Sequence, residues 1–271
     1  MFLEDELHAA YKLINSPILN FPFPHLYVEN MFSEKFYSEI QDNLLDFNEM
    51  TSIASLNPEI PGLAIYKDRL VVDFNKKKSI QKVTKDKQEF WTSFHEKMAP
   101  SLRNIFQAKF KNFLDMRFKY LKNVSYTDQL QLVCDRKNYS LGPHTDQQSK
   151  VVSLLIYLPK DRAQISTGTS IYMPKDPSKL NLDSPHLHYK KEDFHKVTTM
   201  PYAPNSAFCF IKTNDSFHGV EQLEMEDTNR WSLQYNIHIT QETADRETEA
   251  RNEHRKAANS SPQKTQSNFS I

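Results

Sequence analysis

The sequence predicts an α+β protein in which an N-terminal helical region supports a mainly β core. Between residues 85 and 121, apolar residues recur at helical spacing, whereas short strand-like runs separated by turn signals follow from residue 128. No helical repeat separates these runs. An antiparallel sandwich or barrel is therefore expected rather than alternating βαβ units.

The helical region, residues 1–127, is expected to pack on the core. Residues 21–45 begin as extended chain punctuated by prolines, and Ser33 is a good N-cap for a helix that follows. Phenylalanines and other apolar residues between 85 and 121 form a helical stripe typical of core packing. Pro100 is expected to kink this helix or to divide it in two.

The β core is expected to span residues 128–240, followed by a charged helix and disordered tail at 241–271. The insert 175–195 is polar and lacks periodicity, which predicts a surface loop. Seven β-like segments are predicted, at 128–135, 151–159, 168–174, 196–202, 206–212, 216–223 and 230–240.

Composition excludes several classes of function. The chain has 271 residues, with 34 Lys plus Arg balancing 34 Asp plus Glu, so bulk electrostatics favours neither nucleic acid nor a membrane surface as a partner. Its four glycines form no Gly-rich phosphate loop. Cys134 and Cys209 lie in apolar runs and are expected to be buried reduced thiols. An acidic N-terminus and the absence of a long apolar run predict a cytoplasmic protein.

The string NYSLGPHTDQQSK carries the first chemical signal. His144 and Asp146 are two residues apart in chain expected to be extended, so their side chains can converge on one ion. His218, in the β-like segment SFHGV, can complete a set of two histidines and one carboxylate, which leaves coordination positions open and suits non-haem Fe(II). The alternatives are a polar turn residue for His144 and a core histidine for His218.

The second signal is RWS at the start of the last predicted strand. Arg230 follows His218 by 12 residues, and the strand period of two places Arg230 and Ser232 on one face. A guanidinium is the best bidentate partner for a carboxylate, and a neighbouring hydroxyl can donate a further hydrogen bond. Such a pair beside a metal suits a 2-oxo dicarboxylate. The alternative for Arg230 alone is a surface residue.

These motifs, in this order, resemble the Fe(II)/2-oxoglutarate-dependent dioxygenases, and the segment FPFPHLYVENMFSEKFYSEI resembles their prolyl-4-hydroxylase-like branch. The resemblance spans about residues 20–240 and implies a double-stranded β-helix (jelly-roll, cupin-like) fold. It implies His144, Asp146 and His218 as iron ligands and Arg230, helped by Ser232, as the partner of the distal carboxylate of 2-oxoglutarate. Fe(II), 2-oxoglutarate and O₂ are then the expected cofactors, with ascorbate as a supporting reductant.

The sequence departs from the prolyl hydroxylases at two positions. Those enzymes usually have Lys where this chain has Arg230, and they often place a cosubstrate-binding Tyr about nine residues before the first ligand, where this chain has Asp135. Tyr139, Gln131 and Tyr157 are candidates to replace that Tyr, and each is equally consistent with packing or surface roles.

The expected function is an oxygenase that hydroxylates an unactivated C–H of a small molecule or peptidyl residue and releases succinate and CO₂. The alternatives are a non-catalytic jelly-roll protein that uses a metal to bind a carbohydrate or peptide, and a zinc or manganese hydrolase or isomerase. Residues 59–73 and 175–195 are candidate substrate loops. His186 and His188 in that insert are expected to be solvated, and His238 is expected in the core or on the surface.

Overall fold

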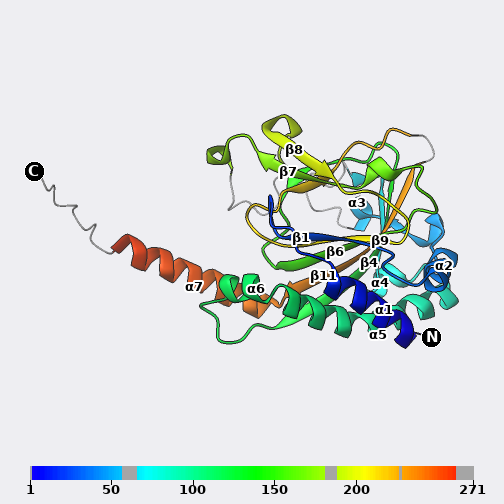
Figure 1. Ribbon diagram of the computed structural model, residues 1–271, viewed down its shortest axis with the longest axis horizontal. Helices are drawn as coiled ribbons and strands as arrows, with labels where there is room; N and C mark the ends of the chain where they lie inside the picture. Colours follow the sequence, from blue (N-terminus) through cyan, green and yellow to red (C-terminus); the bar gives the residue numbers. More distant parts are fainter. Residues whose placement is uncertain (1, 57–65, 181–187, 226–227, 261–271) are drawn as a thin grey trace, which may run out of the picture.

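Two antiparallel sheets face each other at the centre of the protein (Figure 1), a computed structural model that describes residues 2–56, 66–180, 188–225 and 228–260. The larger sheet has seven strands, in the order β1 (His25–Glu29), β9 (Ser206–Ile211), β6 (Lys150–Tyr157), β11 (Asn229–Ile239), β4 (Tyr126–Arg136), β3 (Arg69–Asp73) and β2 (Thr51–Ser52). The smaller sheet has four, in the order β5 (Leu141–His144), β10 (His218–Val220), β7 (Thr169–Pro174) and β8 (Phe194–Thr199).

The pairing of strands β4 to β11 is nested. β4 pairs with β11, β5 with β10, β6 with β9, and β7 with β8, all antiparallel. The chain from β4 to β7 therefore runs out along one side of a two-stranded ribbon, and the chain from β8 to β11 returns along the other. Successive pairs of this ribbon alternate between the two sheets. This is the double-stranded β-helix that the sequence motifs imply, and the prediction is confirmed.

The N-terminal region contributes strands as well as helices to the core. β1 extends the large sheet beside β9, while β3 and β2 extend it beyond β4. The sequence predicted extended chain for the first of these segments, but not the addition of either segment to the large sheet. Because β3 pairs with β4 and β4 pairs with β11, residues 69–73 are separated by one strand from the cosubstrate-binding candidates on β11.

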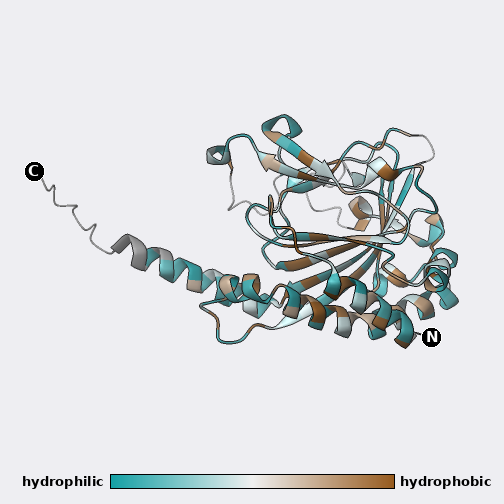
Figure 2. Cartoon of the chain, in the orientation of Figure 1, coloured by the Kyte–Doolittle hydropathy of each residue, from teal (hydrophilic) through white to brown (hydrophobic). Residues whose placement is uncertain are grey.

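Helices cover the outer face of the large sheet (Figures 1 and 2). Its outward side chains, such as Leu233, Tyr235 and Ile237 on β11, share one apolar cluster with Trp91 and Phe94 of the long helix α5. The apolar side chains of α5 are buried on one face because they recur at helical spacing. The longer helices of this layer are α1 (Phe2–Asn15), α2 (Glu34–Asp42), α5 (Lys85–Lys109) and α6 (Lys111–Arg117). The chain also forms shorter helical segments, which are α3 (Ile53–Leu56), α4 (Lys77–Ile80), η1 (Phe47–Glu49), η3 (Ile165–Thr167), η4 (Pro177–Lys179) and η5 (Lys191–Asp193).

Several local predictions are confirmed. Ser33 caps α2, because its hydroxyl accepts a hydrogen bond from the Phe36 amide. Of the two alternatives for Pro100, division into two helices is wrong, because Pro100 lies within the single helix α5; the kink stays a prediction. All seven predicted β segments contain a strand. Cys134 and Cys209 are buried on β4 and β9 and form no disulfide.

At the C-terminal end, α7 (Gln241–Ser260) is largely hydrophilic and projects away from the sheets (Figures 1 and 2), as the charge pattern predicts. Its first turns are held to α6, since Arg117 forms an ion pair with the buried Glu247 at 3.0 Å. The predicted tail at 261–271 lies outside the described residues. Within the described part of the chain, none of the helices combines the length and apolar character needed to cross a bilayer.

Candidate metal centre and cosubstrate cavity

The two predicted histidine ligands lie opposite each other on paired strands of the small sheet. His144 ends β5 and His218 begins β10, and their Cα atoms are register partners. Their ring centroids are 4.3 Å apart. Gly219 permits this close approach, because a Cβ there would collide with the carbonyl oxygen of Leu141. The close pairing of β5 and β10 therefore requires glycine at position 219, next to His218.

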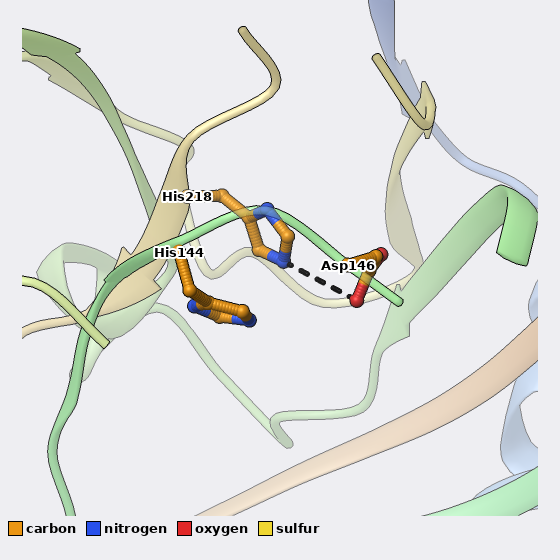
Figure 3. A group of neighbouring side chains, drawn as sticks. All are labelled: His144, Asp146 and His218. Atoms are coloured by element: carbon orange, nitrogen blue, oxygen red, sulfur yellow. Dashed lines mark ion pairs between the residues drawn. The ribbon is translucent and has the colours of Figure 1, made fainter. Parts of the chain in front are cut away.

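Asp146 completes the group from the loop after β5. Its carboxylate faces both imidazoles (Figure 3), with Oδ1 4.0 Å from Nε2 of His218. One ligand atom from each of the three residues lies within 4.8 Å of the others. The predicted convergence is thus present, although Asp146 lies two residues beyond the end of the strand rather than on it.

The hydrogen bonds of the two imidazoles fit metal ligation. Nδ1 of His144 donates to the carbonyl of Gly142 at 3.0 Å, and Nδ1 of His218 donates to the carbonyl of Ser216 at 2.9 Å. With its proton on Nδ1, each ring keeps a lone pair on Nε2. Burial lowers the pKa of both histidines, and for His144 the neighbouring His218 lowers it further, so both rings are neutral near pH 7. The donor set fits a divalent metal ion.

The carboxylate of Asp146 is held by two side chains of β6. Nζ of Lys150 donates to Oδ1 at 2.9 Å, and the hydroxyl of Ser153 donates to Oδ2 at 2.8 Å. Burial alone would raise the pKa of Asp146, but Lys150 and the two histidines outweigh it and hold that pKa well below its usual value. Asp146 is therefore an anionic ligand in the neutral range of pH.

A cavity between the two sheets joins these three residues to Arg230. Apolar walls come from Leu141, Leu155, Phe210 and Val220. The polar lining outside the His–Asp–His group comprises Arg69, Lys150, Ser153, Thr169, Arg230 and Gln234. Cations thus outnumber anions on the side of the cavity away from the metal candidates, and this favours a negatively charged ligand.

Arg230 is almost fully buried, with 2% of its side chain exposed. Its guanidinium donates to the carbonyl of Thr167 at 2.6 Å, to a carboxylate oxygen of Asp135 at 2.9 Å and to the hydroxyl of Thr169 at 3.3 Å. The rings of Tyr157 and Tyr202 lie 5.6 and 5.5 Å from it. These contacts fix the guanidinium in the cavity wall.

The other predicted cosubstrate residues do not line the cavity. Ser232 is buried and lies 3.5 Å from the amide nitrogen of Gln234, whereas Gln131 donates to Asp73 at 3.3 Å. The guanidinium carbon of Arg69 lies over the ring of Tyr139, 4.5 Å from the ring centroid. Their predicted roles in binding 2-oxoglutarate stay predictions, and their contacts in the structure are with neighbouring side chains.

Sequence reasoning did not assign Arg69, Thr169 or Gln234 to the site. Gln234 shares the strand parity of Arg230 and could have been found by that signal. Arg69 opens the apolar run RLVVD, but its place became visible only with the pairing of β3 and β4. Thr169 lies in a segment predicted to be a strand without chemical significance.

The insert 175–195 contributes to the border of the site. His188 is exposed, as expected, yet its ring stacks on that of His144 with centroids 4.8 Å apart, and its Nδ1 contacts the hydroxyl of Tyr66. His186 and residues 59–65 of the candidate loop 59–73 lie outside the described residues. His238 does not line the cavity, and burial lowers its pKa to about 4.

Comparisons with known proteins find likeness in structure alone. No known family profile matches the sequence, and no curated protein matches it. Similar solved structures include a 2OG-Fe(II) oxygenase family oxidoreductase from Burkholderia pseudomallei, with 12% identity and a TM-score of 0.42 over 86% of this chain and 89% of that chain. A Pseudomonas putida prolyl-4-hydroxylase has 9% identity and a TM-score of 0.43 over 87% and 99%. The epimerase SnoN, solved with Fe³⁺, alpha ketoglutarate and nogalamycin RO, has 11% identity and a TM-score of 0.47 over 86% and 83%.

These structures fall in the superfamily that the sequence motifs resemble. Their names include an epimerase and a prolyl-4-hydroxylase. With TM-scores below 0.5 the likeness is partial. The function proposed for this chain therefore rests on its own geometry.

Proposed function

We propose that the protein is an Fe(II)- and 2-oxoglutarate-dependent oxygenase that hydroxylates an unactivated C–H bond of a small molecule or a peptidyl residue. The observation that supports this proposal best is the combination within one cavity of the His144–Asp146–His218 group and the buried guanidinium of Arg230. Two neutral imidazoles and one carboxylate suit Fe(II) and leave positions for further ligands. An anchored guanidinium suits the far carboxylate of a 2-oxo dicarboxylate.

Different residues of this chain would bind the metal and the cosubstrate. His144, Asp146 and His218 would hold Fe(II), and Arg230 would bind the distal carboxylate of 2-oxoglutarate and so orient its 2-oxo acid end toward the metal. When bound, Fe(II) would supply the activation of O₂ that couples conversion of 2-oxoglutarate to succinate and CO₂ with oxygen insertion into the substrate C–H bond. The apolar side chains of Leu141, Leu155, Phe210 and Val220 would limit the access of water to the reacting groups.

Anaerobic titration tests the metal and cosubstrate assignments. Fe(II) and 2-oxoglutarate together should give a weak visible charge-transfer band in the wild-type protein. Asp146→Ala and His218→Ala should each abolish it. His95→Ala is the matched control, because His95 is a partly buried histidine on α5 that does not line the cavity, and this variant should keep the band. An undiminished band in either ligand variant would reject the ligand assignment.

Turnover tests the reaction class. With Fe(II), 2-oxoglutarate and O₂, a library of small molecules and peptides should contain substrates that stimulate succinate formation and gain one oxygen atom by mass. Arg230→Gln should raise the 2-oxoglutarate concentration needed for half-maximal turnover by about 10- to 100-fold, because the variant loses a hydrogen bond to a charged group. Metal binding without succinate formation on any member would instead favour the non-catalytic jelly-roll binding protein.

A further inference from the structure

We propose that Arg69 is a second cosubstrate-binding residue and that Asp135 positions it together with Arg230. In this proposal, which rests on the proposed function, the two guanidinium groups share the distal carboxylate of 2-oxoglutarate. The three residues form a row across adjacent strands β3, β4 and β11. Asp135 is the direct register partner of Arg69 on one side and of Arg230 on the other.

The ion pairs in this row are close and well formed. Nε and Nη2 of Arg69 donate to the two oxygens of Asp135 at 2.6 and 3.0 Å, a bidentate arrangement. Nη1 of Arg230 donates to one of the same oxygens at 2.9 Å. Asp135 is fully buried, with 0% of its side chain exposed, so its charge needs both partners. The carboxylate thereby fixes the orientation of both guanidinium groups.

The row keeps an unbalanced positive charge that faces the cavity. Two guanidinium groups against one carboxylate leave one net positive charge, and both arginines line the cavity that contains the metal candidates. Among the described residues, Nη1 of Arg69 makes no hydrogen bond, although the guanidinium lies over the ring of Tyr139. Its N–H groups are therefore available to a carboxylate that enters the cavity.

This arrangement explains the side chain at position 135. Where the prolyl hydroxylases often have a cosubstrate-binding Tyr, this chain has an acid, and an ionised carboxylate cannot donate a hydrogen bond to another carboxylate. Asp135 can contribute to the binding of an anionic cosubstrate by positioning a cationic side chain that contacts it. Arg69 is that cation, and Tyr139 supports it from the other side.

Ligand truncation separates recognition of the distal carboxylate from a merely structural role. Binding of 2-oxoglutarate and of 2-oxopentanoate, which has the same chain length but no distal carboxylate, would be measured by calorimetry on Mn(II)-loaded protein. Arg69→Gln should weaken 2-oxoglutarate binding by about 10- to 100-fold and leave 2-oxopentanoate binding within about twofold. Asp135→Asn should also reduce the preference for 2-oxoglutarate, because the arginines lose their common anchor.

Arg103→Gln is the matched control. Arg103 forms a similar two-atom pair with Asp128, away from the cavity, so this variant should leave both affinities unchanged. Should Arg69→Gln fail to fold, Arg69→Lys keeps the charge but loses the fork, and a selective loss of 2-oxoglutarate affinity is again expected.

The outcomes distinguish this inference from the proposed function. Unchanged 2-oxoglutarate affinity in the Arg69 variant, or an equal loss for both ligands, would overturn the role of Arg69 while the oxygenase proposal stands. A wild-type protein that binds Mn(II) but neither ligand would overturn both. A selective loss for 2-oxoglutarate supports the two-arginine site.

Discussion

Lys150 forms an ion pair with the same oxygen of Asp146 that faces His218. Its Nζ lies 2.9 Å from Oδ1, and Oδ1 lies 4.0 Å from Nε2 of His218. A metal ion that binds through Oδ1 would have to share or displace this ion pair and tolerate the positive charge beside it. Ser153 meanwhile holds the other oxygen and keeps the carboxylate in orientation.

Replacing Lys150 by Met should therefore raise the affinity for Mn(II) by about 3- to 10-fold, the scale of one partly buried ion pair. Calorimetric titration with Mn(II) measures this. Lys111→Met removes an exposed lysine from its pair with Asp115 and should leave metal affinity unchanged. A weaker metal site in Lys150→Met would mean that the lysine orients Asp146 rather than competing for it.

At the level of single residues, the sequence was sufficient for those side chains whose relation depends on short-range periodicity. His144 and Asp146 are two residues apart in chain predicted to be extended. Arg230 follows His218 by 12 residues, at the start of the next predicted strand. Arg69 could not be found in this way. Its neighbours in space come from strands far along the chain, and their register depends on packing of the whole sheet.

At the scale of elements, Glu49 joins the short helix η1 to the start of α5. Its carboxylate accepts hydrogen bonds from the amides of Asp46 and Thr84, both at 2.8 Å, and pairs with Lys87 at 3.0 Å. Burial opposes ionisation, but these donors outweigh it and lower the pKa of Glu49 from 4.5 to about 2. Thr84 is the N-cap residue of α5, so this single side chain anchors the beginning of the longest helix.

Glu49→Gln should lower the free energy of unfolding by about 1–3 kcal/mol at pH 7. Because the folded-state pKa lies below the unfolded one, the contribution is complete above pH 4.5 and is lost as the pH falls toward 2. The difference between wild type and variant should therefore shrink over that interval in urea titrations. Glu89→Gln, at an exposed pair with Lys85, should show little difference at any pH. A pH-independent difference for Glu49→Gln would exclude the charge as its source.

Elements with long, regular patterns were predictable, and those defined by tertiary pairing were not. The helical stripe of α5 and the apolar runs of β6 and β9 are visible in the sequence. β5 was missed as a strand, because Gly142 and Pro143 within it suggest a turn. Its strand character comes from pairing with β10, and Gly219 allows that approach.

For the molecule as a whole, the antiparallel β core followed from the succession of short strands without helices between them. The nested order of strand pairs did not, since many antiparallel arrangements satisfy the same pattern; it came from the resemblance and is now seen in the strand pairing. This order has a consequence for stability. His144 and His218 lie 74 residues apart in sequence (218 − 144), and a metal bound to both would tie the two sides of the ribbon together.

Metal binding should therefore stabilise the whole fold. An ion that binds the folded but not the unfolded chain adds about 2.7 kcal/mol at 100 times its Kd, and for a chain of this length that corresponds to a rise in Tm of about 5–10 °C. Thermal unfolding with Mn(II) and with a chelator measures the shift. His95→Ala should retain it, whereas Asp146→Ala and His218→Ala should lose it. An equal rise in those ligand variants would show that the ion stabilises the protein from another site, because neither could then supply the complete donor set.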